Sequence, residues 1–164
     1  MPMEQHVDSA EIPSVPVYQT IIEVLPKDID ELNHANNVCY VHWMQEIAIH
    51  HSTALGWPTS RYTEEGTAWV ARRHTVDYLN QAFLGDQILA ETWIAEMKNV
   101  SSLRRYRFTR VSDHALLATA ETRWGFVSLT TGRPTKVPPE MHAIFIQNMP
   151  CDPNAASDDS SKNQ

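Results

Sequence analysis

The chain has 164 residues and a formal net charge of −7, and 42% of its residues are hydrophobic. This length suits one domain with a sizeable core and is short for two. Residues 1–16 and 150–164 carry −3 and −2 of the charge, which leaves −2 for the middle of the chain. Such a near-neutral domain argues against a nucleic-acid binder, which is usually basic over one face.

Other classes of protein are excluded by features that the sequence lacks. No apolar run approaches the roughly 20 residues that span a bilayer, and the N-terminus does not have the pattern of a signal peptide. The five glycines form no phosphate-binding loop, and no cofactor is expected. Cys39 and Cys151 are too few for a disulfide framework, which favours a reducing, cytoplasmic setting.

The two ends of the chain are predicted to be disordered, over residues 1–16 and 148–164, because they are polar and rich in turn formers. The folded domain is then residues 17–147. Its first element is a strand over Val17–Leu25, which is rich in β-branched side chains and ends before Pro26.

A long helix is predicted over residues 38–55. Its apolar side chains recur at spacings of three and four residues, which places them in one broad stripe. They include Tyr40, Val41, Trp43, Met44, Ile47, Ala48, His51, Ala54 and Leu55. Gly56 and Pro58 mark the end of this helix.

Four further strands are predicted after the helix, and short turns between them imply antiparallel pairing. They span Thr67–Leu79, Gln87–Met97, Leu103–Val111 and Leu116–Leu129. These strands make a five-stranded sheet, and a short edge element over Met141–Ile146 would make it six-stranded. The predicted fold class is α+β, with one long central helix wrapped by a curved antiparallel sheet.

A polar segment, Lys27–Trp43, leads into the predicted helix. It holds the carboxylates Asp28 and Asp30, the imidazole of His34, and the carboxamides of Asn33, Asn36 and Asn37. Such residues before a helix usually cap it or form turns. A cap needs only one of them, so the surplus of acid, imidazole and carboxamide indicates a functional site.

This segment carries a family resemblance. The run Asp-Ile-Asp-Glu-Leu-Asn-His-Ala-Asn-Asn-Val-Cys-Tyr-Val-His-Trp resembles the signature of the 4-hydroxybenzoyl-CoA thioesterase-like family and of related acyl-carrier-protein thioesterases. Residues 73–79, 84–86 and 131–134 are similar to later strands and turns of that family. The resemblance implies the hotdog fold and hydrolysis of an acyl-CoA or acyl-carrier-protein thioester.

The resemblance also implies a role for each residue of the motif. Asp30 matches the catalytic carboxylate, as nucleophile or general base, and His34 matches a histidine that orients or activates the site. The backbone N–H near Asn37 matches the donor that polarises the thioester carbonyl, at the positive end of a helix dipole. Asn36 and Tyr40 are expected to contact the substrate.

Acyl-CoA also carries phosphates, so a protein that binds it needs a few cations near the mouth of its site. The candidates are Arg72, Arg73, Lys98, Arg104 and Arg105. The alternative is that these are exposed strand residues that only keep the protein soluble.

The tryptophans bear on assembly, because one helix covers only one face of the predicted sheet. Trp69, Trp93 and Trp124 would otherwise leave apolar patches exposed. We therefore expect a homodimer or homotetramer with its site near a subunit interface.

Three alternatives remain open. His42, Glu46 and His50 recur every four residues, as zinc ligands do, although a solvated helix face explains them as well and no metal is expected. Cys39 would be a reactive thiol if its pKa were lowered. The same fold also hosts dehydratases, hydratases and non-catalytic acyl-CoA-binding proteins.

Overall fold

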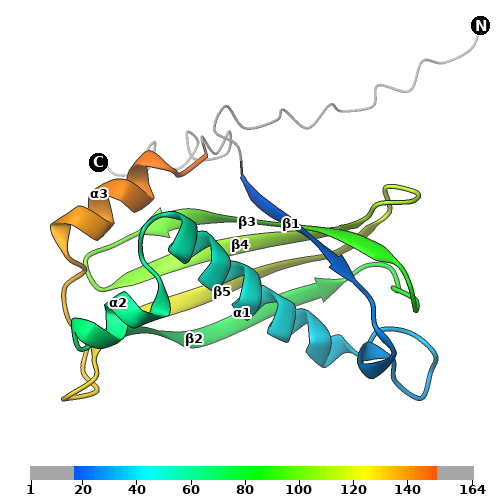
Figure 1. The fold of residues 1–164 in the computed structure, drawn as a ribbon, viewed down its shortest axis with the longest axis horizontal. Helices are drawn as coiled ribbons and strands as arrows, with labels where there is room; N and C mark the ends of the chain where they lie inside the picture. Colours follow the sequence, from blue (N-terminus) through cyan, green and yellow to red (C-terminus); the bar gives the residue numbers. More distant parts are fainter. Residues whose placement is uncertain (1–16, 151–164) are drawn as a thin grey trace, which may run out of the picture.

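The computed structural model describes residues 17–150. The predicted leader (1–16) and the tail from residue 151 lie outside this range. Figure 1 shows two main layers, a curved sheet and the long helix α1 that crosses one of its faces. No helix in the described range is long and apolar enough to cross a bilayer.

All five strands pair antiparallel, in the spatial order β1-β3-β4-β5-β2. The strands are β1 (Tyr18–Glu23), β2 (Thr67–Tyr78), β3 (Gln87–Met97), β4 (Ser101–Arg110) and β5 (Leu116–Ser128). The helices are η1 (Pro26–Asp28), α1 (Asn37–Ala54), α2 (Thr59–Glu64) and α3 (Pro139–Gln147). This architecture confirms the predicted α+β hotdog fold, with β1 and β2 at the two edges of the sheet.

Two short helices differ from the sequence-based expectation. The edge element predicted over Met141–Ile146 is wrong, because these residues belong to α3. Pro139 occupies the first turn, where a proline costs no hydrogen bond, and Met141 and Phe145 are buried one turn apart. Helix α2 was not predicted, since Pro58 was interpreted only as the end of α1, whereas it is the N-cap of the next helix.

The larger part of the core lies between α1 and the middle of the sheet. Tyr40, Trp43, Met44 and Ile47 face the sheet from α1, at the three- and four-residue spacing of one helix face. Phe108 of β4 is fully buried against them, and the Tyr40 ring meets it edge-on at 5.4 Å. This packing fixes the N-terminal half of α1 over the sheet.

A second cluster of the core lies beyond the C-terminal end of α1. Trp57 and Phe126 pack there with Met141 and Phe145 of α3. Helix α1 packs on the first cluster through Tyr40 to Ala48, and Leu55 and Trp57, just after its last turn, pack in the second cluster. Both ends of the helix are therefore fixed relative to the sheet.

Candidate functional site

The loop before α1 is closed by its own backbone. The N–H of Asp30 donates to the carbonyl of His34 at 3.0 Å, and Ile29 forms a bridge with Ala35. Asn33, at the tip, has a φ of +63°, a left-handed conformation that asparagine tolerates better than most residues. The polar segment identified from the sequence is therefore a compact turn that returns the chain toward Asp30.

This turn places the Asp30 carboxylate beside the His34 ring. Oδ2 of Asp30 lies 3.7 Å from Nδ1 of His34, and the two side chains are 23% and 16% exposed. Oδ1 accepts a hydrogen bond from the N–H of Leu32 at 2.9 Å. Nδ1 of His34 also lies 3.3 Å from the carbonyl oxygen of Ala35, an acceptor, which favours the tautomer that carries its proton on Nδ1. The carboxylate is thus held by the loop and still reaches solvent.

Helix α1 begins immediately after this loop. Asn36 is its N-cap, and the Oδ1 of its side chain accepts from the N–H of Val38 at 2.9 Å. Within residues 17–150 the backbone N–H of Asn37 has no acceptor, while its carbonyl accepts from the Tyr78 hydroxyl at 2.8 Å. An unused donor at the positive end of an 18-residue helix is a suitable site for a developing negative charge.

Asp28 and Cys39 lie behind this loop and hold it in place. Asp28 is 7% exposed, and its Oδ2 accepts from the N–H of Leu25 at 2.9 Å. The Cys39 thiol lies 3.7 Å from Oδ1 of Asp28, and burial followed by the charge of Asp28 raises its pKa. A raised pKa argues against the reactive-thiol alternative for Cys39.

Tyr40 lies in the core and not on the surface of the loop. Its ring is 2% exposed and packs edge-on against Tyr78 and Trp43, and burial raises its pKa to about 12. We assign it a packing role under the first turn of α1 in place of the expected contact with substrate.

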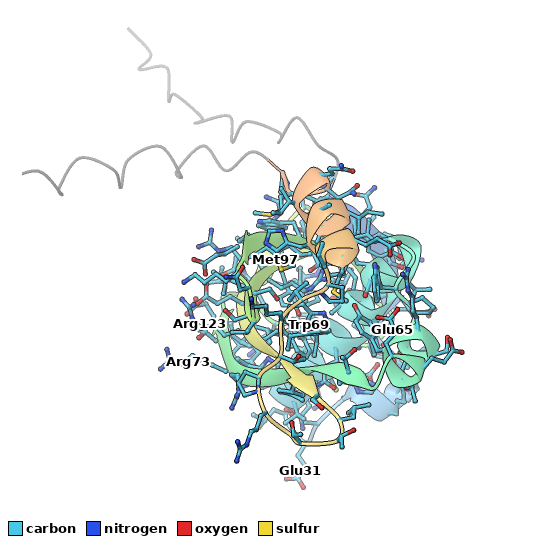
Figure 2. The ribbon with its side chains drawn as sticks, turned by 90° about the vertical axis from the view of Figure 1, so that its left-hand side faces the viewer. Glu31, Glu65, Trp69, Arg73, Met97 and Arg123 are labelled. Atoms are coloured by element: carbon cyan, nitrogen blue, oxygen red, sulfur yellow. The ribbon has the colours of Figure 1, made fainter. Side chains whose placement is uncertain are left out.

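The five candidate cations do not form one group. Arg72 and Arg73 are exposed on the edge strand β2, and Figure 2 shows Arg73 directed away from the helical layer. Arg105 is half-buried, with its Nε 3.8 Å from Oε2 of Glu121, and Lys98 pairs with Glu96 at 3.3 Å. The interpretation of Arg104 as an exposed strand residue is wrong, because it is only 6% exposed.

The histidine stripe of α1 points to solvent. His42 and Glu46 form an exposed pair at 3.3 Å, and His50 is exposed on the same side. Within the described range no three His, Cys, Asp or Glu side chains are grouped as a metal site would require. The solvated-face alternative therefore accounts for this spacing.

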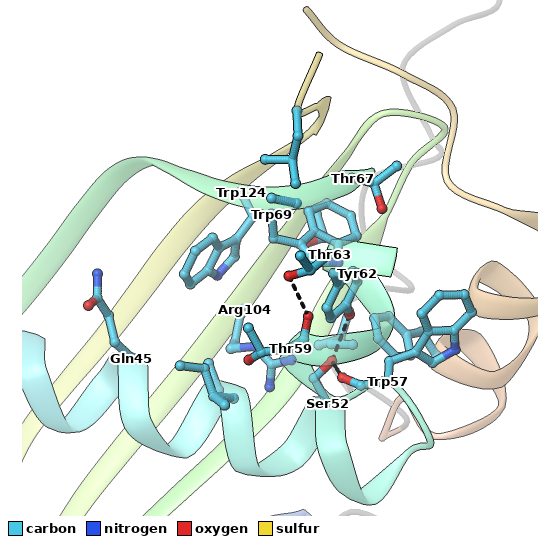
Figure 3. A pocket seen from close by; sticks show the side chains of 17 residues that line it. Gln45, Ser52, Trp57, Thr59, Tyr62, Thr63, Thr67, Trp69, Arg104 and Trp124 are labelled. Carbon is cyan, nitrogen blue, oxygen red and sulfur yellow. Dashed lines mark hydrogen bonds between the residues drawn. The ribbon is translucent and has the colours of Figure 1, made fainter. Parts of the chain in front are cut away.

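A pocket of about 400 Å³ opens between the C-terminal half of α1, α2 and the start of β2 (Figure 3). Its walls are largely apolar, and they include the aromatic side chains of Trp57, Tyr62, Trp69, Trp124 and Phe145. This volume falls in the range of small-molecule sites. The sequence did not predict this pocket, because its walls come from segments far apart in the chain.

Arg104 lines the pocket and is bound to α1 through a histidine. Its Nη1 donates to Nδ1 of His51 at 2.8 Å and to the hydroxyl of Thr92 at 3.3 Å. Because an arginine only donates, His51 accepts through an unprotonated Nδ1. Burial first, and then the charge of Arg104, lower the pKa of His51 to about 3, so the imidazole stays neutral and adds no charge.

This neutral histidine predicts a pH-dependent stability. The unfolded chain binds a proton on His51 near pH 6.5 and the folded chain only near pH 3, so stability is lost as the pH falls below 6.5. Between pH 7 and pH 5 the loss due to His51 is about 2 kcal/mol. Urea unfolding at both pH values, compared with His51→Gln, measures it. Gln keeps an acceptor for Arg104, and equal pH slopes in the two proteins would contradict the prediction.

The thioesterase-like superfamily model matches residues 24–145 of the chain, which includes the Asp30 loop, α1 and all strands except β1. The chain belongs to the thioesterase-like superfamily. Hydrolysis of an acyl-CoA thioester is the activity that this membership supports. A comparison with curated proteins returned no match.

Solved structures of the same fold resemble this superfamily member at low sequence identity. A DHNA-CoA thioesterase from Staphylococcus aureus is 17% identical with a TM-score of 0.74, covering 79% of this chain and 88% of that one. A 1,4-dihydroxy-2-naphthoyl-CoA thioesterase from Synechocystis is 15% identical with a TM-score of 0.74, covering 80% and 96%. A hypothetical protein from Staphylococcus aureus in complex with CoA is 16% identical with a TM-score of 0.78, covering 84% and 89%.

Proposed function

We propose that the chain hydrolyses acyl-CoA thioesters with Asp30 as the catalytic carboxylate. The observation that carries the proposal is the position of Asp30, beside His34 in the loop that leads into α1, whose first N–H, that of Asn37, has no acceptor within residues 17–150. A thioester carbonyl is activated enough for one carboxylate and an oriented donor to act on it without a catalytic triad. The cytoplasm is the proposed location, in keeping with the free thiol of Cys39.

In this reaction the Asn37 N–H binds the carbonyl oxygen as negative charge develops there. Asp30 then acts in one of two ways. As a general base it removes a proton from water, which attacks the carbonyl carbon; as a nucleophile it forms an anhydride that water hydrolyses. In both cases the carbon–sulfur bond breaks and CoA leaves as the thiol. His34 orients the carboxylate, through the 3.7 Å contact between its Nδ1 and Oδ2 of Asp30.

The aromatic pocket is the proposed site of the acyl group, but it lies at the far end of α1 from Asp30. The α1 residues that line it begin at Gln45, 8 residues or about 12 Å along the helix beyond Asn37, and continue to Ser52 near the other end. A second copy of the chain brings the two together if its β2 pairs antiparallel with this β2. Strand β2 runs from the pocket at Thr67 to Tyr78 beside Asn37, so a twofold pairing sets the Asp30 loop of one copy near the pocket of the other.

The outer edge of β2 is suited to this pairing. It is 12 residues long, it pairs with no strand of residues 17–150 other than β5, and its central residues from Val70 to Arg73 are exposed. A long uncovered edge is a template for another strand. The sheet therefore supports a homodimer, and a homotetramer would be a pair of such dimers.

Light scattering at micromolar concentration tests the assembly. The expected mass is at least twice the 18.7 kDa of one chain. A monomer mass would contradict the shared site, because one chain alone separates its pocket from its carboxylate.

The function is tested with purified protein and a panel of acyl-CoA and acyl-carrier-protein thioesters, with release of free thiol as the measurement. Hydrolysis of at least one thioester is expected, and hydrolysis confined to carrier-protein substrates would correct the choice of CoA. Water addition to an enoyl-CoA without thiol release would instead favour a hydratase. Tight binding of acyl-CoA without turnover would favour a non-catalytic binding protein.

A further inference from the structure

Arg104 is a buried charge without a charged partner. It is 6% exposed, and no acidic side chain of residues 17–150 forms an ion pair with it. Its two acceptors, His51 and the Thr92 hydroxyl, are both neutral and both contact Nη1. A charge removed from water is costly unless it is paired, so this guanidinium lacks the anion that would compensate its burial.

Arg104 lines the pocket, and part of its guanidinium is left without a hydrogen-bond acceptor in the described part of the chain. Among residues 17–150 no acceptor is found for Nε or Nη2. Arginine donates in a planar fork that matches the two oxygens of a carboxylate. Figure 3 shows the guanidinium between α1 and the strands, among the side chains that line the pocket.

The rest of the pocket wall is neutral. The indole N–H groups of Trp69 and Trp124 and the hydroxyl of Thr67 are buried within the wall and do not face the open cavity. Among the described residues that line the pocket, Arg104 is the one charged side chain, and no carboxylate lines it. The pocket thus offers a cation to its ligand, which suits an anionic group.

We propose that Arg104 determines substrate specificity by binding a carboxylate at the far end of the acyl group. The inference rests on the proposed function, since it assigns the pocket to the acyl group of a thioester. The substrate class is then a dicarboxylic acid joined to CoA through one of its two carboxyl groups. The aromatic walls contact the carbon chain, and the free carboxylate lies against the guanidinium.

Matched substrates that differ only at the chain end test this specificity. We would compare succinyl-, glutaryl- and adipyl-CoA with butyryl-, pentanoyl- and hexanoyl-CoA, at equal chain length. For the pair that the wild type hydrolyses fastest, kcat/KM should be at least about tenfold higher for the carboxylate-ended ester, as a charge-assisted hydrogen bond predicts. A wild type that hydrolyses both members of every pair equally well, or prefers the uncharged one, overturns the proposal.

Substitution of Arg104 should reverse the preference. Arg104→Met keeps the length of the side chain without its charge, so the methyl-ended ester should become the better substrate, whereas Arg104→Lys should keep part of the original preference. The matched control is Arg123→Met, because Arg123 is an exposed arginine on the neighbouring strand and lies outside the pocket (Figure 2). An unchanged ratio in folded Arg104→Met overturns the proposal.

A binding measurement separates this inference from the proposed function. Titration calorimetry of the wild type with hexanoate and with hexanamide compares a carboxylate with a neutral group of the same shape. Tighter binding of hexanoate by at least about tenfold supports the role of Arg104 even if no thioester is hydrolysed and the proposed function fails. Equal binding of the two compounds overturns the role of Arg104. It does not bear on thioester hydrolysis, which the thiol-release assay tests separately. This arm needs no variant, so it decides the question even if Arg104→Met does not fold.

Discussion

Asp30→Asn is expected to lower kcat for thioester hydrolysis by about 10² to 10⁴, the range associated with removing a general base. The amide keeps the shape of the carboxylate and its acceptor for the N–H of Leu32 at 2.9 Å, so the loop should stay folded. What it loses is the charge that attacks the carbonyl or removes a proton from water. Steady-state release of free thiol, with an acyl-CoA that the wild type accepts, measures the effect, and KM should change little.

Asp28→Asn is the matched control, because the two acids are only two residues apart. Asp28 is buried, and it accepts from the N–H of Leu25 while facing the Cys39 thiol, so its role is to hold the loop. The amide retains one acceptor oxygen, and kcat should fall by less than about tenfold, with a stability cost of about 1 kcal/mol. If Asp30→Asn kept wild-type kcat while His34→Ala or Cys39→Ala abolished activity, another residue would carry the reaction.

The long helix and the strands were predictable from the sequence because each has a strong local pattern. The stripe from Tyr40 to Ile47 follows the helical period, and it is the stripe that packs on the sheet. Helix α2 has six residues, none of them buried, so it shows no such period. In α3 only nine residues were available, and Met141, Ala143 and Phe145 fit the alternation of a short strand as well as Met141, Ile144 and Phe145 fit a helix.

The loop that carries Asp30 was also predictable, since all its polar groups are close in sequence. The spacing of Asp30 and His34 becomes a spatial contact because a tight turn closes between them. Tyr40 shows the limit of this approach. It belongs to the motif, but it also lies on the face of α1 that packs on the sheet, and its side chain is therefore buried in the core.

The pocket could not be predicted, because its wall joins the C-terminal half of α1 to the start of β2 and the start of β4. One signal for Arg104 was present in the alternation of β4. Tyr106 and Phe108 point to the core, and Arg104 is two residues before Tyr106, so it shares their face. The alternation places an arginine inward, but only the structure shows that His51 of α1 lies opposite it.

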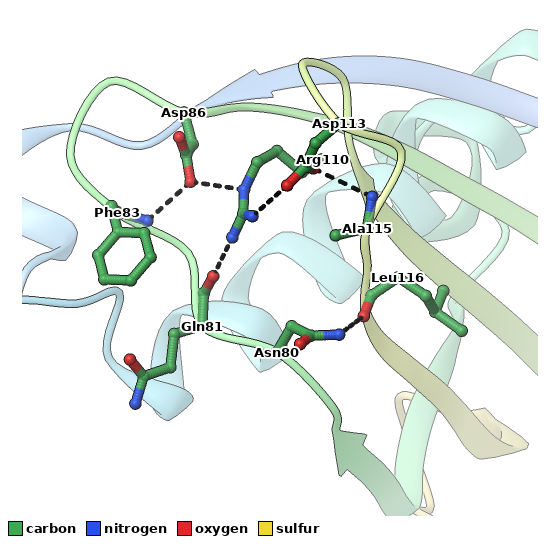
Figure 4. Close-up of polar contacts among 8 residues, drawn as sticks. All are labelled: Asn80, Gln81, Phe83, Asp86, Arg110, Asp113, Ala115 and Leu116. Carbon is green, nitrogen blue, oxygen red and sulfur yellow. Dashed lines mark hydrogen bonds and ion pairs between the residues drawn. The ribbon is translucent and has the colours of Figure 1, made fainter.

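The Asp30 loop also depends on the loop before β3. Arg110, at the end of β4, binds that second loop through hydrogen bonds (Figure 4). Arg110 donates to Asp86 at 3.0 Å, to Asp113 at 2.9 Å and to the carbonyl of Gln81. The neighbouring residue Ala82 accepts from the N–H of Ala35 at 2.8 Å, directly beside His34. Arg110 therefore supports the Asp30 loop through one intervening segment.

Arg110→Met is expected to lower the free energy of unfolding by roughly 2 to 3 kcal/mol. The side chains of Arg110 and Asp86 are 14% and 21% exposed, so the loss falls between that of a surface pair and that of a fully buried one. Part of the cost arises because Asp86 keeps its hydrogen bond from the N–H of Phe83 but loses its cation. Urea unfolding at pH 7 measures the change.

Arg123→Met provides the control for this experiment, since it makes the same substitution at an exposed pair. Nη1 of Arg123 lies 3.9 Å from Glu96, with the two side chains 51% and 41% exposed, and its loss should cost less than about 0.5 kcal/mol. If the two variants were equally stable, the contacts of Arg110 would contribute no more than a surface pair. In that case backbone hydrogen bonds alone would hold the loop before β3. The bond from the N–H of Ala35 to Ala82, and with it the position of the Asp30 loop, would not depend on Arg110.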